Sequence, residues 1–404
     1  MRAERTADRA VLDVALLDPA GDGSALLDRA LQPFGRSTML PASAYTSAAV
    51  LAWEQRHIFA GTWSCVGRLA DLSGTGVRQR ALLVGDVPAL LTWGAVDEQP
   101  RAYANTCRHR GHELLSDGET STRQSIVCPY HAWSYELDGS LRAAPGFRDL
   151  TAFDPDDHRL VELPLAVWHG WVFVHAAHGV DDHAEPGFAA HVAALDAIVA
   201  PYSPADLVLR ARHTYTVHAN WKVVTENYHE CYHCPLIHPE LCQVSPPTSG
   251  DNYRLPGAWV GGSMDLRDEM ATMSIDGRSD APAIPGVDPR KVEYVGLFPN
   301  LLISAHPDYV MAHRLVPLAP DRTWVECSWY FRASDPPVDP AYAVDFWDLT
   351  NRQDWAACES VQRGLGSPHH RPGPLAPNED AVHQFVQLVG RAYRGQPVTD
   401  VSLT

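Results

Sequence analysis

Two cysteines and two histidines form the first group of residues that could do chemistry. Cys107 and His109 are separated by one residue, and eighteen residues later Cys128 and His131 are separated by two. Two thiolates can hold one iron of a [2Fe–2S] cluster while two neutral imidazoles hold the other, which raises the reduction potential. A Cys2His2 zinc site is the alternative, but zinc fingers usually pair Cys with Cys and His with His. Here each pair combines one cysteine with one histidine, which favours the [2Fe–2S] cluster over zinc.

A second group lies in the segment NWKVVTENYHECYHCPLIHPEL, residues 220–241. A helix here would place Glu226, Glu230 and His233 on one face, because they fall at i, i+4 and i+7. A break after this helix would let His238 converge with His233 on one metal ion. Two histidines and one carboxylate bind Fe(II) and leave positions open for dioxygen and substrate.

Two questions stay open at this point. The third ligand must be a carboxylate from elsewhere in the chain. Three nearby cysteines also leave a zinc site as an alternative, and these are Cys231, Cys234 and Cys242.

The two groups together resemble a known family. The pieces CRHRGHEL and CPYHAWSYELDGSL resemble the Rieske domain in the large (α) subunit of Rieske non-haem iron oxygenases, with Ala132 where the family commonly has Gly. The segment 220–241 resembles the mononuclear iron motif of the same family, so that the resemblance covers residues 35–395.

The resemblance implies the ligands of both metal sites. Cys107, His109, Cys128 and His131 would bind the Rieske cluster. The piece NRQDWAACESVQRGLGS is similar to the family's ligand-bearing C-terminal helix, which makes Asp354 the third iron ligand beside His233 and His238, with Glu359 as the alternative. Glu379 and Asp380 are expected to be ordinary acids at a helix start.

The resemblance also implies two residues that act beside the iron. In family members, a carboxylate three residues before the first histidine links the Rieske cluster of one subunit to the iron of its neighbour, and Glu230 stands at that position. Such a carboxylate would bond to both His131 and His233 and orient their rings. Asn227 would lie near the iron without binding it.

The expected activity is oxygenation with electrons from another protein. The chain has neither a G-x-G-x-x-G motif after a strand nor a four-cysteine ferredoxin set. NAD(P)H would therefore act indirectly, through a flavin and iron–sulfur reductase, with or without an intermediate ferredoxin. The resemblance implies a head-to-tail homotrimer, and a β subunit remains open.

The substrate expectation rests on the form ENYHECYHC, which is most similar to the betaine, stachydrine and carnitine branch. Members of this branch oxidise quaternary ammonium compounds, with loss of an N-methyl group as formaldehyde. A cation needs an aromatic cage, for which Tyr253, Trp259 and Phe298 are candidates. The alternative is hydroxylation, dihydroxylation or O-demethylation of an aromatic or natural-product substrate.

These residues require two domains of different kinds. Residues 1–45 are expected to form an arm that packs on the catalytic domain, residues 46–180 the Rieske domain, and residues 181–404 the catalytic domain. Short β-type runs and an Asp138-Gly139 hairpin signal predict that the Rieske domain is all-β. Strands followed by helices predict an α+β catalytic domain, and the resemblance implies that it has an antiparallel, helix-grip-like sheet with covering helices. A turn-rich acidic segment, residues 179–188, marks the boundary.

Composition excludes several other classes. The 404 residues carry a net charge of -17, with 45% hydrophobic and 20% charged residues. Such a chain is globular and lacks the basic surface that nucleic acids and anionic membranes require. Its longest uncharged apolar stretch, residues 164–180, is too short and polar to span a bilayer. The N-terminus lacks the apolar run of a secretory signal, so we expect a cytoplasmic enzyme. A bare electron carrier or a zinc scaffold would not need the second ligand group.

Overall fold

The computed structural model describes residues 10–18, 21–94, 97–177 and 187–399. The chain forms two compact units, one made of residues 1–53 with 184–404 and the other of residues 54–183. The expected boundary segment, residues 179–188, lies mostly outside the described residues, as do residues 1–9. Among the described helices, none combines the length and apolar character needed to cross a membrane.

The smaller unit is built from antiparallel β-sheets. A three-stranded sheet has the order β1-β11-β10, a five-stranded sheet the order β5-β2-β3-β4-β9, and a second three-stranded sheet the order β6-β7-β8. The strands are β1 (Ser64–Arg68), β2 (Gln79–Val84), β3 (Val87–Trp93), β4 (Pro100–Ala104), β5 (Thr120–Ser121), β6 (Ser125–Val127), β7 (Ser134–Glu136), β8 (Leu141–Ala143), β9 (Glu162–Leu163), β10 (Leu165–Trp168) and β11 (Trp171–Val174). The helical turns are η2 (Gln55–Phe59), α4 (Leu69–Ser73) and η3 (Pro155–His158).

The Asp138-Gly139 hairpin forms as the sequence predicts, between β7 and β8. Asp138 accepts a hydrogen bond from the backbone of Ser140 at 2.9 Å, and Gly139 has a φ of 79°, which glycine adopts at little cost. Tyr135 of this hairpin belongs to a hydrophobic cluster that also includes Trp133 and the predicted ligands Cys107 and Cys128. The cluster therefore fixes the backbone from which those cysteines extend.

The larger unit contains one seven-stranded antiparallel sheet with the order β12-β18-β17-β16-β15-β14-β13. Its strands are β12 (Val208–Val217), β13 (Asp251–Asn252), β14 (Trp259–Asp265), β15 (Lys291–Leu297), β16 (Leu301–Ala305), β17 (Tyr309–Ala319) and β18 (Arg322–Phe331). Its helices are η1 (Val14–Leu16), α1 (Gly23–Ala30), α2 (Ser43–Thr46), α3 (Ala48–Glu54), α5 (Phe188–Val192), α6 (Leu195–Val199), η4 (Ala200–Tyr202), η5 (Pro204–Asp206), α7 (Trp221–Tyr228), α8 (Cys234–Ile237), α9 (Pro239–Val244), α10 (Ala341–Leu365) and α11 (Asp380–Tyr393).

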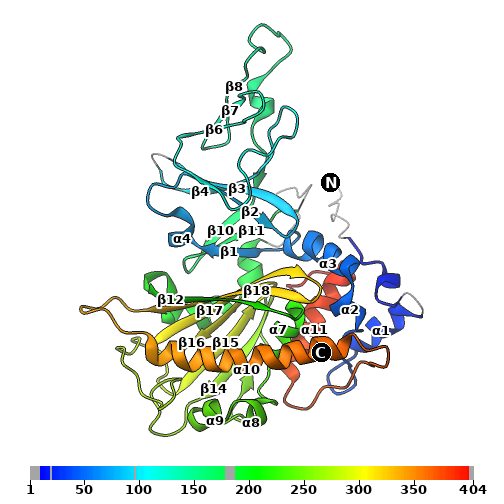
Figure 1. Ribbon diagram of the computed structural model, residues 1–404, viewed down its shortest axis with the longest axis vertical. Helices are drawn as coiled ribbons and strands as arrows, with labels where there is room; N and C mark the ends of the chain where they lie inside the picture. Colours follow the sequence, from blue (N-terminus) through cyan, green and yellow to red (C-terminus); the bar gives the residue numbers. More distant parts are fainter. Residues whose placement is uncertain (1–9, 19–20, 95–96, 178–186, 400–404) are drawn as a thin grey trace, which may run out of the picture. The chain divides into compact units, whose positions relative to one another are not determined.

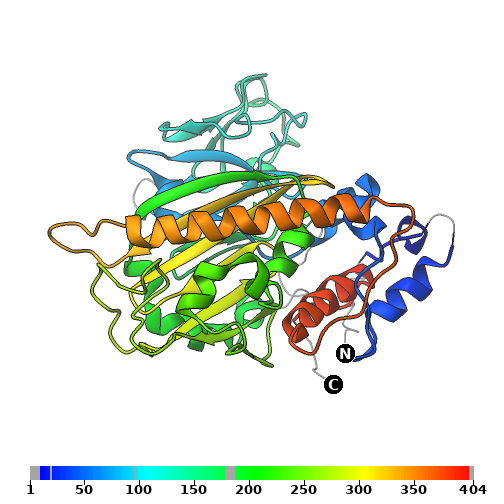
Figure 2. The same cartoon turned by 60° about the horizontal axis from the view of Figure 1, so that its bottom comes forward.

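The long helix α10 lies across one face of this sheet, as both views of the ribbon show (Figures 1 and 2). It is held there by polar contacts as well as by its apolar face. The indole of Trp347 donates to the Tyr309 hydroxyl on β17 at 2.7 Å, and the imidazole of His313, also on β17, lies 3.2 Å from Asn351 Oδ1. The predicted α+β fold with a helix gripped against an antiparallel sheet is confirmed.

The N-terminal arm belongs to the larger unit. The backbone amide of Leu12 donates to Tyr393 at the end of α11, and Thr38 forms a β-bridge with Pro374. The contacts divide the units after Trp53, eight residues beyond the expected end of the arm at residue 45.

One local prediction was wrong. The helix expected in the segment 220–241 ends at Tyr228, so Glu226, Glu230 and His233 do not share a helical face. At the end of the sheet opposite β12, β13 and β14 complete one edge.

Candidate metal centres and the adjoining cavity

In the smaller unit, two loops of similar shape present the first ligand group. Cys107 follows β4 and bonds through its amide to the His112 carbonyl at 2.8 Å. Cys128 follows β6 and bonds in the same way to the Trp133 carbonyl at 2.8 Å. In each loop the cysteine carbonyl also accepts a bond from an amide four residues on, that of Gly111 or Ala132. The repeated geometry brings the two Cys-His halves together.

The cysteines of this group are more deeply buried than its histidines, of which His109 is half-buried. Both cysteines are buried and free, whereas His131 is exposed and its ring centroid lies 4.8 Å from that of His109. Burial raises the pKa of the Cys107 thiol, so the thiolate needs a cationic partner there. Two buried sulfurs beneath two adjacent imidazoles fit a [2Fe–2S] cluster whose histidine-bound iron faces outward.

Ala132 adopts a backbone conformation that explains the expected glycine. Its φ is 60°, in the left-handed region where a side chain is unfavourable. The turn after His131 therefore tolerates alanine at a cost in backbone energy. The departure from the family pattern is local to this turn.

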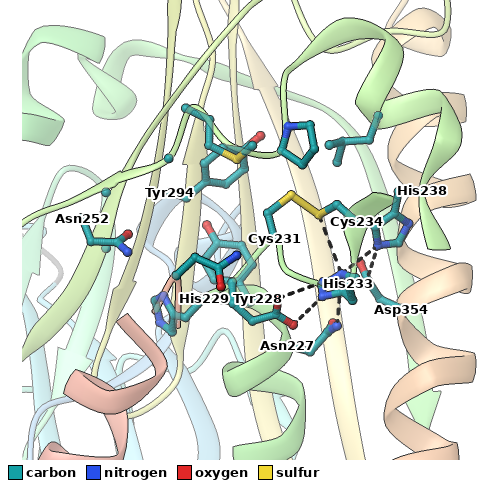
Figure 3. A pocket seen from close by; sticks show the side chains of 18 of the residues that line it. Asn227, Tyr228, His229, Cys231, His233, Cys234, His238, Asn252, Tyr294 and Asp354 are labelled. Atoms are coloured by element: carbon teal, nitrogen blue, oxygen red, sulfur yellow. Dashed lines mark hydrogen bonds and ion pairs between the residues drawn. A yellow bond between two sulfur atoms is a disulfide. The ribbon is translucent and has the colours of Figure 1, made fainter. Parts of the chain in front are cut away.

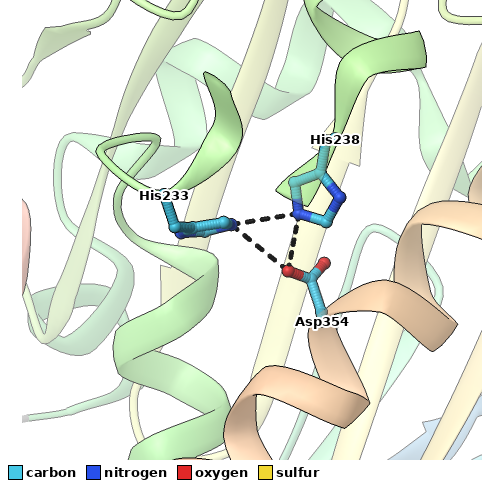
Figure 4. Close-up of side chains that lie close together, drawn as sticks. All are labelled: His233, His238 and Asp354. Carbon is cyan, nitrogen blue, oxygen red and sulfur yellow. Dashed lines mark hydrogen bonds and ion pairs between the residues drawn. The ribbon is translucent and has the colours of Figure 1, made fainter. Parts of the chain in front are cut away.

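In the larger unit, His233, His238 and Asp354 converge from separate elements (Figure 4). His233 immediately precedes α8, His238 lies between α8 and α9, and Asp354 is on α10. The Nε2 atoms of the histidines are 3.0 Å apart. Asp354 Oδ1 lies 2.8 Å from His238 Nε2 and 3.3 Å from His233 Nε2.

Hydrogen bonds at the Nδ1 atoms of His233 and His238 determine which ring nitrogen of each histidine can bind a metal ion. The Nδ1 of His238 lies 2.7 Å from Gln353 Oε1, and the Nδ1 of His233 bonds to Glu230 Oε1. Because both partners are acceptors, each neutral imidazole carries its proton on Nδ1 and turns the Nε2 lone pair toward Asp354. Ligand atoms about 2.1 Å from one octahedral metal and adjacent to each other lie about 3 Å apart. The spacing and the three converging lone pairs fit a mononuclear metal ion.

The pKa shifts of His233 and Asp354 also indicate that a positive charge is favourable at this site. Burial alone would lower the pKa of His233, but its bonds to Asp354 and Glu230 outweigh burial and raise the pKa to about 9. Burial alone would raise the pKa of Asp354, but its hydrogen bonds with His233 and His238 hold this pKa below its usual value. A proton supplies the charge when no metal is bound, and a divalent cation would displace it.

A cavity of about 510 Å³ adjoins the three ligands (Figure 3). Its aromatic lining consists of Phe34, Tyr228, Tyr294, Trp347 and Trp355. Four carboxylates also line it, and they are Glu230, Asp251, Asp354 and Asp380. Arg254 is the one lysine or arginine among the described residues that line the cavity.

The prediction that Tyr253, Trp259 and Phe298 form an aromatic cage for a cation was wrong. Trp259 is buried and donates to the Pro256 carbonyl at 3.0 Å, Phe298 packs near Trp221, and Tyr253 donates to Glu293 at 2.9 Å. None of these three lines the cavity. The aromatic residues that do so come from the N-terminal arm, from the end of α7, from β15 and from α10, and none of them was predicted from the sequence to line a substrate site.

The remaining predicted residues are also placed. Asn227 lines the cavity, with Nδ2 3.5 Å from His233 Nε2. Glu359, the alternative ligand, instead accepts a bond from the backbone amide of His218 at 3.1 Å. Asp380 is in the first turn of α11, as expected. Sequence reasoning missed Gln353, which precedes Asp354 and bonds to His238.

Two of the cysteines beside the histidines form a disulfide, Cys231–Cys234, which lines the cavity next to His233 (Figure 3). The sequence left these cysteines as candidate zinc ligands, and the structure pairs two of them with each other instead. A zinc site that uses these two thiolates is excluded by their pairing. Cys242 is free.

Both units match models of known protein families. Residues 62–154 match the family model of the Rieske [2Fe-2S] domain, and residues 204–395 match that of the ring hydroxylating alpha subunit (catalytic domain). The chain is 31% identical over 379 residues to the glycine betaine monooxygenase oxygenase subunit of Chromohalobacter salexigens, covering 83% of this chain and 81% of that protein. It is 30% identical over 340 residues to the carnitine monooxygenase oxygenase subunit of Escherichia coli K12, covering 82% and 85%.

Solved structures share the fold. The quaternary ammonium Rieske monooxygenase CntA in complex with L-carnitine has a TM-score of 0.69 at 23% identity, over 95% of this chain and 99% of that one. Naphthalene 1,2-dioxygenase from a Rhodococcus species has a TM-score of 0.66 at 18% identity, over 90% of this chain and 95% of that one.

Proposed function

Because the chain belongs to the Rieske oxygenase large-subunit family, we propose that it oxidatively removes an N-methyl group from a quaternary ammonium substrate. Family membership makes the chain an oxidoreductase with a Rieske [2Fe–2S] cluster and a mononuclear iron. As an oxygenase subunit it works with a reductase, O2 and an organic substrate.

We assign the cluster to Cys107, His109, Cys128 and His131, and the iron to His233, His238 and Asp354. The observation that carries the second assignment is the convergence of three ligand atoms, 2.8 to 3.3 Å apart, beside a cavity. The bound iron would supply reductive activation of O2. Around it the protein orients both imidazoles through Glu230 and Gln353.

The lining of the cavity supports a cationic substrate. Five aromatic side chains and four carboxylates line it, against one arginine. Aromatic faces attract a desolvated quaternary ammonium group, and carboxylates raise the local concentration of cations. Two similar proteins are named for glycine betaine and carnitine, both quaternary ammonium compounds.

The proposed reaction balances with two electrons from the reductase. A substrate R–N⁺(CH3)3, O2, two electrons and two protons give R–N⁺(CH3)2CH2OH and water. The hydroxymethyl group then leaves as formaldehyde, which yields R–N(CH3)2 and a proton. NAD(P)H would supply the electrons through a flavin and iron–sulfur reductase, with or without a ferredoxin.

We also propose that the chain acts as a homotrimer in which the cluster of one subunit serves the iron of the next. Exposed apolar residues support a contact beside the iron site, because Tyr232 is 62% and Leu236 91% exposed on either side of His233. On the smaller unit, Tyr130 is 54% exposed next to His131. Glu230 would bridge the two sites by bonding to His233 and to His131 of the neighbour.

The test combines metal content with product analysis. We expect about three iron atoms per chain and, with NADH and a reductase, formaldehyde in a 1:1 ratio to consumed glycine betaine or γ-butyrobetaine. The chain with NADH alone should not turn over. Formation of a diol or a phenol from an aromatic compound, without formaldehyde from either ammonium compound, would contradict N-demethylation.

A further inference from the structure

The cavity extends well beyond the three metal ligands. In Figure 3, Asn252 lies on the opposite side of the cavity from His233, His238 and Asp354. The lining of this far end includes Asp251, Asn252 and Arg254, together with Asp380 at the start of α11. A substrate with its reactive group at the metal would therefore present its other end to these residues.

The backbone fixes which side chains of this segment face the cavity. Asp251 and Asn252 form β13, where Asn252 pairs with Gly262 on β14, and the next amide, that of Tyr253, donates to the Gly261 carbonyl at 2.8 Å. Side chains alternate along extended chain. Tyr253 turns away and bonds to Glu293, whereas Asn252 and Arg254, two residues apart, both line the cavity, as does Asp251 before them.

Arg254 is a cation without a partner at this position. It is exposed, and it makes no hydrogen bond or ion pair with the residues that the structure describes. Other arginines of the same unit are engaged: Arg290, for example, bonds to the Leu266 carbonyl at 2.6 Å. The neighbouring carboxylate of Asp380 accepts a bond from Asn252 at 2.5 Å instead.

We infer that Arg254 binds the carboxylate of a zwitterionic substrate and so selects betaines over quaternary ammonium alcohols. This inference rests on the proposed N-demethylation. A guanidinium can hold a carboxylate with two parallel hydrogen bonds, which adds orientation to charge attraction. With the carboxylate at Arg254, the trimethylammonium group extends along the aromatic lining toward the metal ligands.

Arg254 is thus a specificity-determining residue rather than one that acts on the reacting atoms. It should contribute to substrate binding before the chemical step, and its removal should raise KM more than it lowers kcat. Because the side chain is exposed, salt should weaken its contribution.

The experiment uses two substrates that differ only at the far end. γ-Butyrobetaine carries a carboxylate, and 4-trimethylammonio-1-butanol carries a hydroxymethyl group in its place. We expect the wild type to prefer the carboxylate in kcat/KM by about 10- to 100-fold, the range of a hydrogen bond to a charged group. In Arg254→Gln this preference should disappear through a higher KM for γ-butyrobetaine, with a much smaller change in KM for the alcohol. Arg254→Lys should retain part of the preference.

The control is Arg278→Gln, which removes a solvent-exposed arginine paired with Asp276. It should leave the substrate preference intact. A wild type without preference, or an Arg254→Gln variant that keeps it, would overturn the inference.

A second matched pair separates this inference from the proposed reaction. 4-Methoxybenzoate and 4-methoxybenzyl alcohol differ in the same way but carry no ammonium group. If only this pair is turned over, and the preference for the acid depends on Arg254, then N-demethylation is wrong and the carboxylate site stands. If neither acid is turned over or bound, the carboxylate site is wrong.

Discussion

The side-chain carbonyl of Gln353 lies 2.7 Å from Nδ1 of His238, one residue before the carboxylate that faces Nε2 of the same ring. The amide nitrogen of Gln353 points toward Glu240 Oε2 at 3.3 Å, which fixes the amide so that its oxygen accepts the proton of His238. One turn of α10 therefore supplies both a proposed metal ligand and the group that orients another.

Replacing Gln353 should weaken the iron site without affecting the cluster. Gln353→Met removes the acceptor of the His238 proton, and partners of this kind typically contribute 10- to 100-fold to metal affinity. We expect a loss of that size in an Fe(II) titration of chain from which the mononuclear iron has been stripped. Gln353→Glu keeps an acceptor and should bind iron nearly as well as the wild type. Equal affinity in Gln353→Met would show that the contact has no orienting role.

Ala132→Gly should stabilise the smaller unit. Alanine at a φ of 60° carries a backbone cost that glycine avoids, although glycine also gains freedom in the unfolded chain. The net gain should be about 0.5 to 1 kcal/mol, measured as a higher melting temperature of the cluster absorbance. Ala144→Gly in the same unit is the control and should not stabilise. A lower melting temperature for Ala132→Gly would mean that the strain is relieved elsewhere.

The ligand spacings were accessible from sequence because each lies within one loop or one short segment. The Cys-His pairs of the smaller unit and the His233 to His238 spacing need no long-range information. Asp354 was found only through the resemblance of its helix to a family motif, since nothing local distinguishes it from Glu359. That distinction depends on how α10 lies across the sheet.

The helix expected through His233 failed for a local reason. The carboxylate of Glu230 accepts bonds from the backbone amides of Tyr232 and His233, amides that a continuing helix would use in its own ladder. Acidic side chains compete with helices in this way. The result turns His233 away from the axis of α7 and toward Asp354, a placement that periodicity could not reveal. The aromatic lining of the cavity was missed because it depends on tertiary packing alone.

Glu226 should make stability depend on pH. Burial raises the pKa of this carboxyl to about 8, despite the hydrogen bond that Tyr45 donates to it at 2.8 Å and the nearby Lys222; Glu379 raises it further. The folded chain therefore binds one more proton than the unfolded chain between about pH 4.5 and 8, so stability from this group falls as pH rises through that window.

Glu226→Gln removes this dependence. Relative to wild type, the variant should become more stable with rising pH, by at most about 1.4 kcal/mol per pH unit, until the difference levels off above pH 8. Melting temperatures of both proteins from pH 5 to 9 measure it, and the difference between them cancels the contribution of other groups. A difference that is constant with pH would show that Glu226 is ionised throughout.

The proposed electron transfer from the cluster of one subunit to the iron of the next predicts that two inactive variants complement each other. Cys107→Ser should lose the cluster and keep the iron, and His233→Ala should do the reverse. Each alone should be inactive. Chains carrying different tags, coexpressed and purified through both tags, should regain activity, because a His233→Ala subunit can serve a neighbouring Cys107→Ser subunit. Random 1:1 mixing in a closed ring pairs them correctly at about one quarter of the contacts, so activity should approach one quarter of wild type before tag selection.

The same mixture of variants shows in which of the two subunits the carboxylate of Glu230 is needed. Glu230→Gln leaves the metal ligands in place but replaces the carboxylate that accepts the His233 proton, so it should slow turnover sharply when placed in the Cys107→Ser chain. In the His233→Ala chain, whose own iron site is already empty, the change should have no effect. Iron and cluster content, measured in each mixture, control for loss of metal. Equal inhibition from both chains, or none from either, would refute a bridging role for this carboxylate.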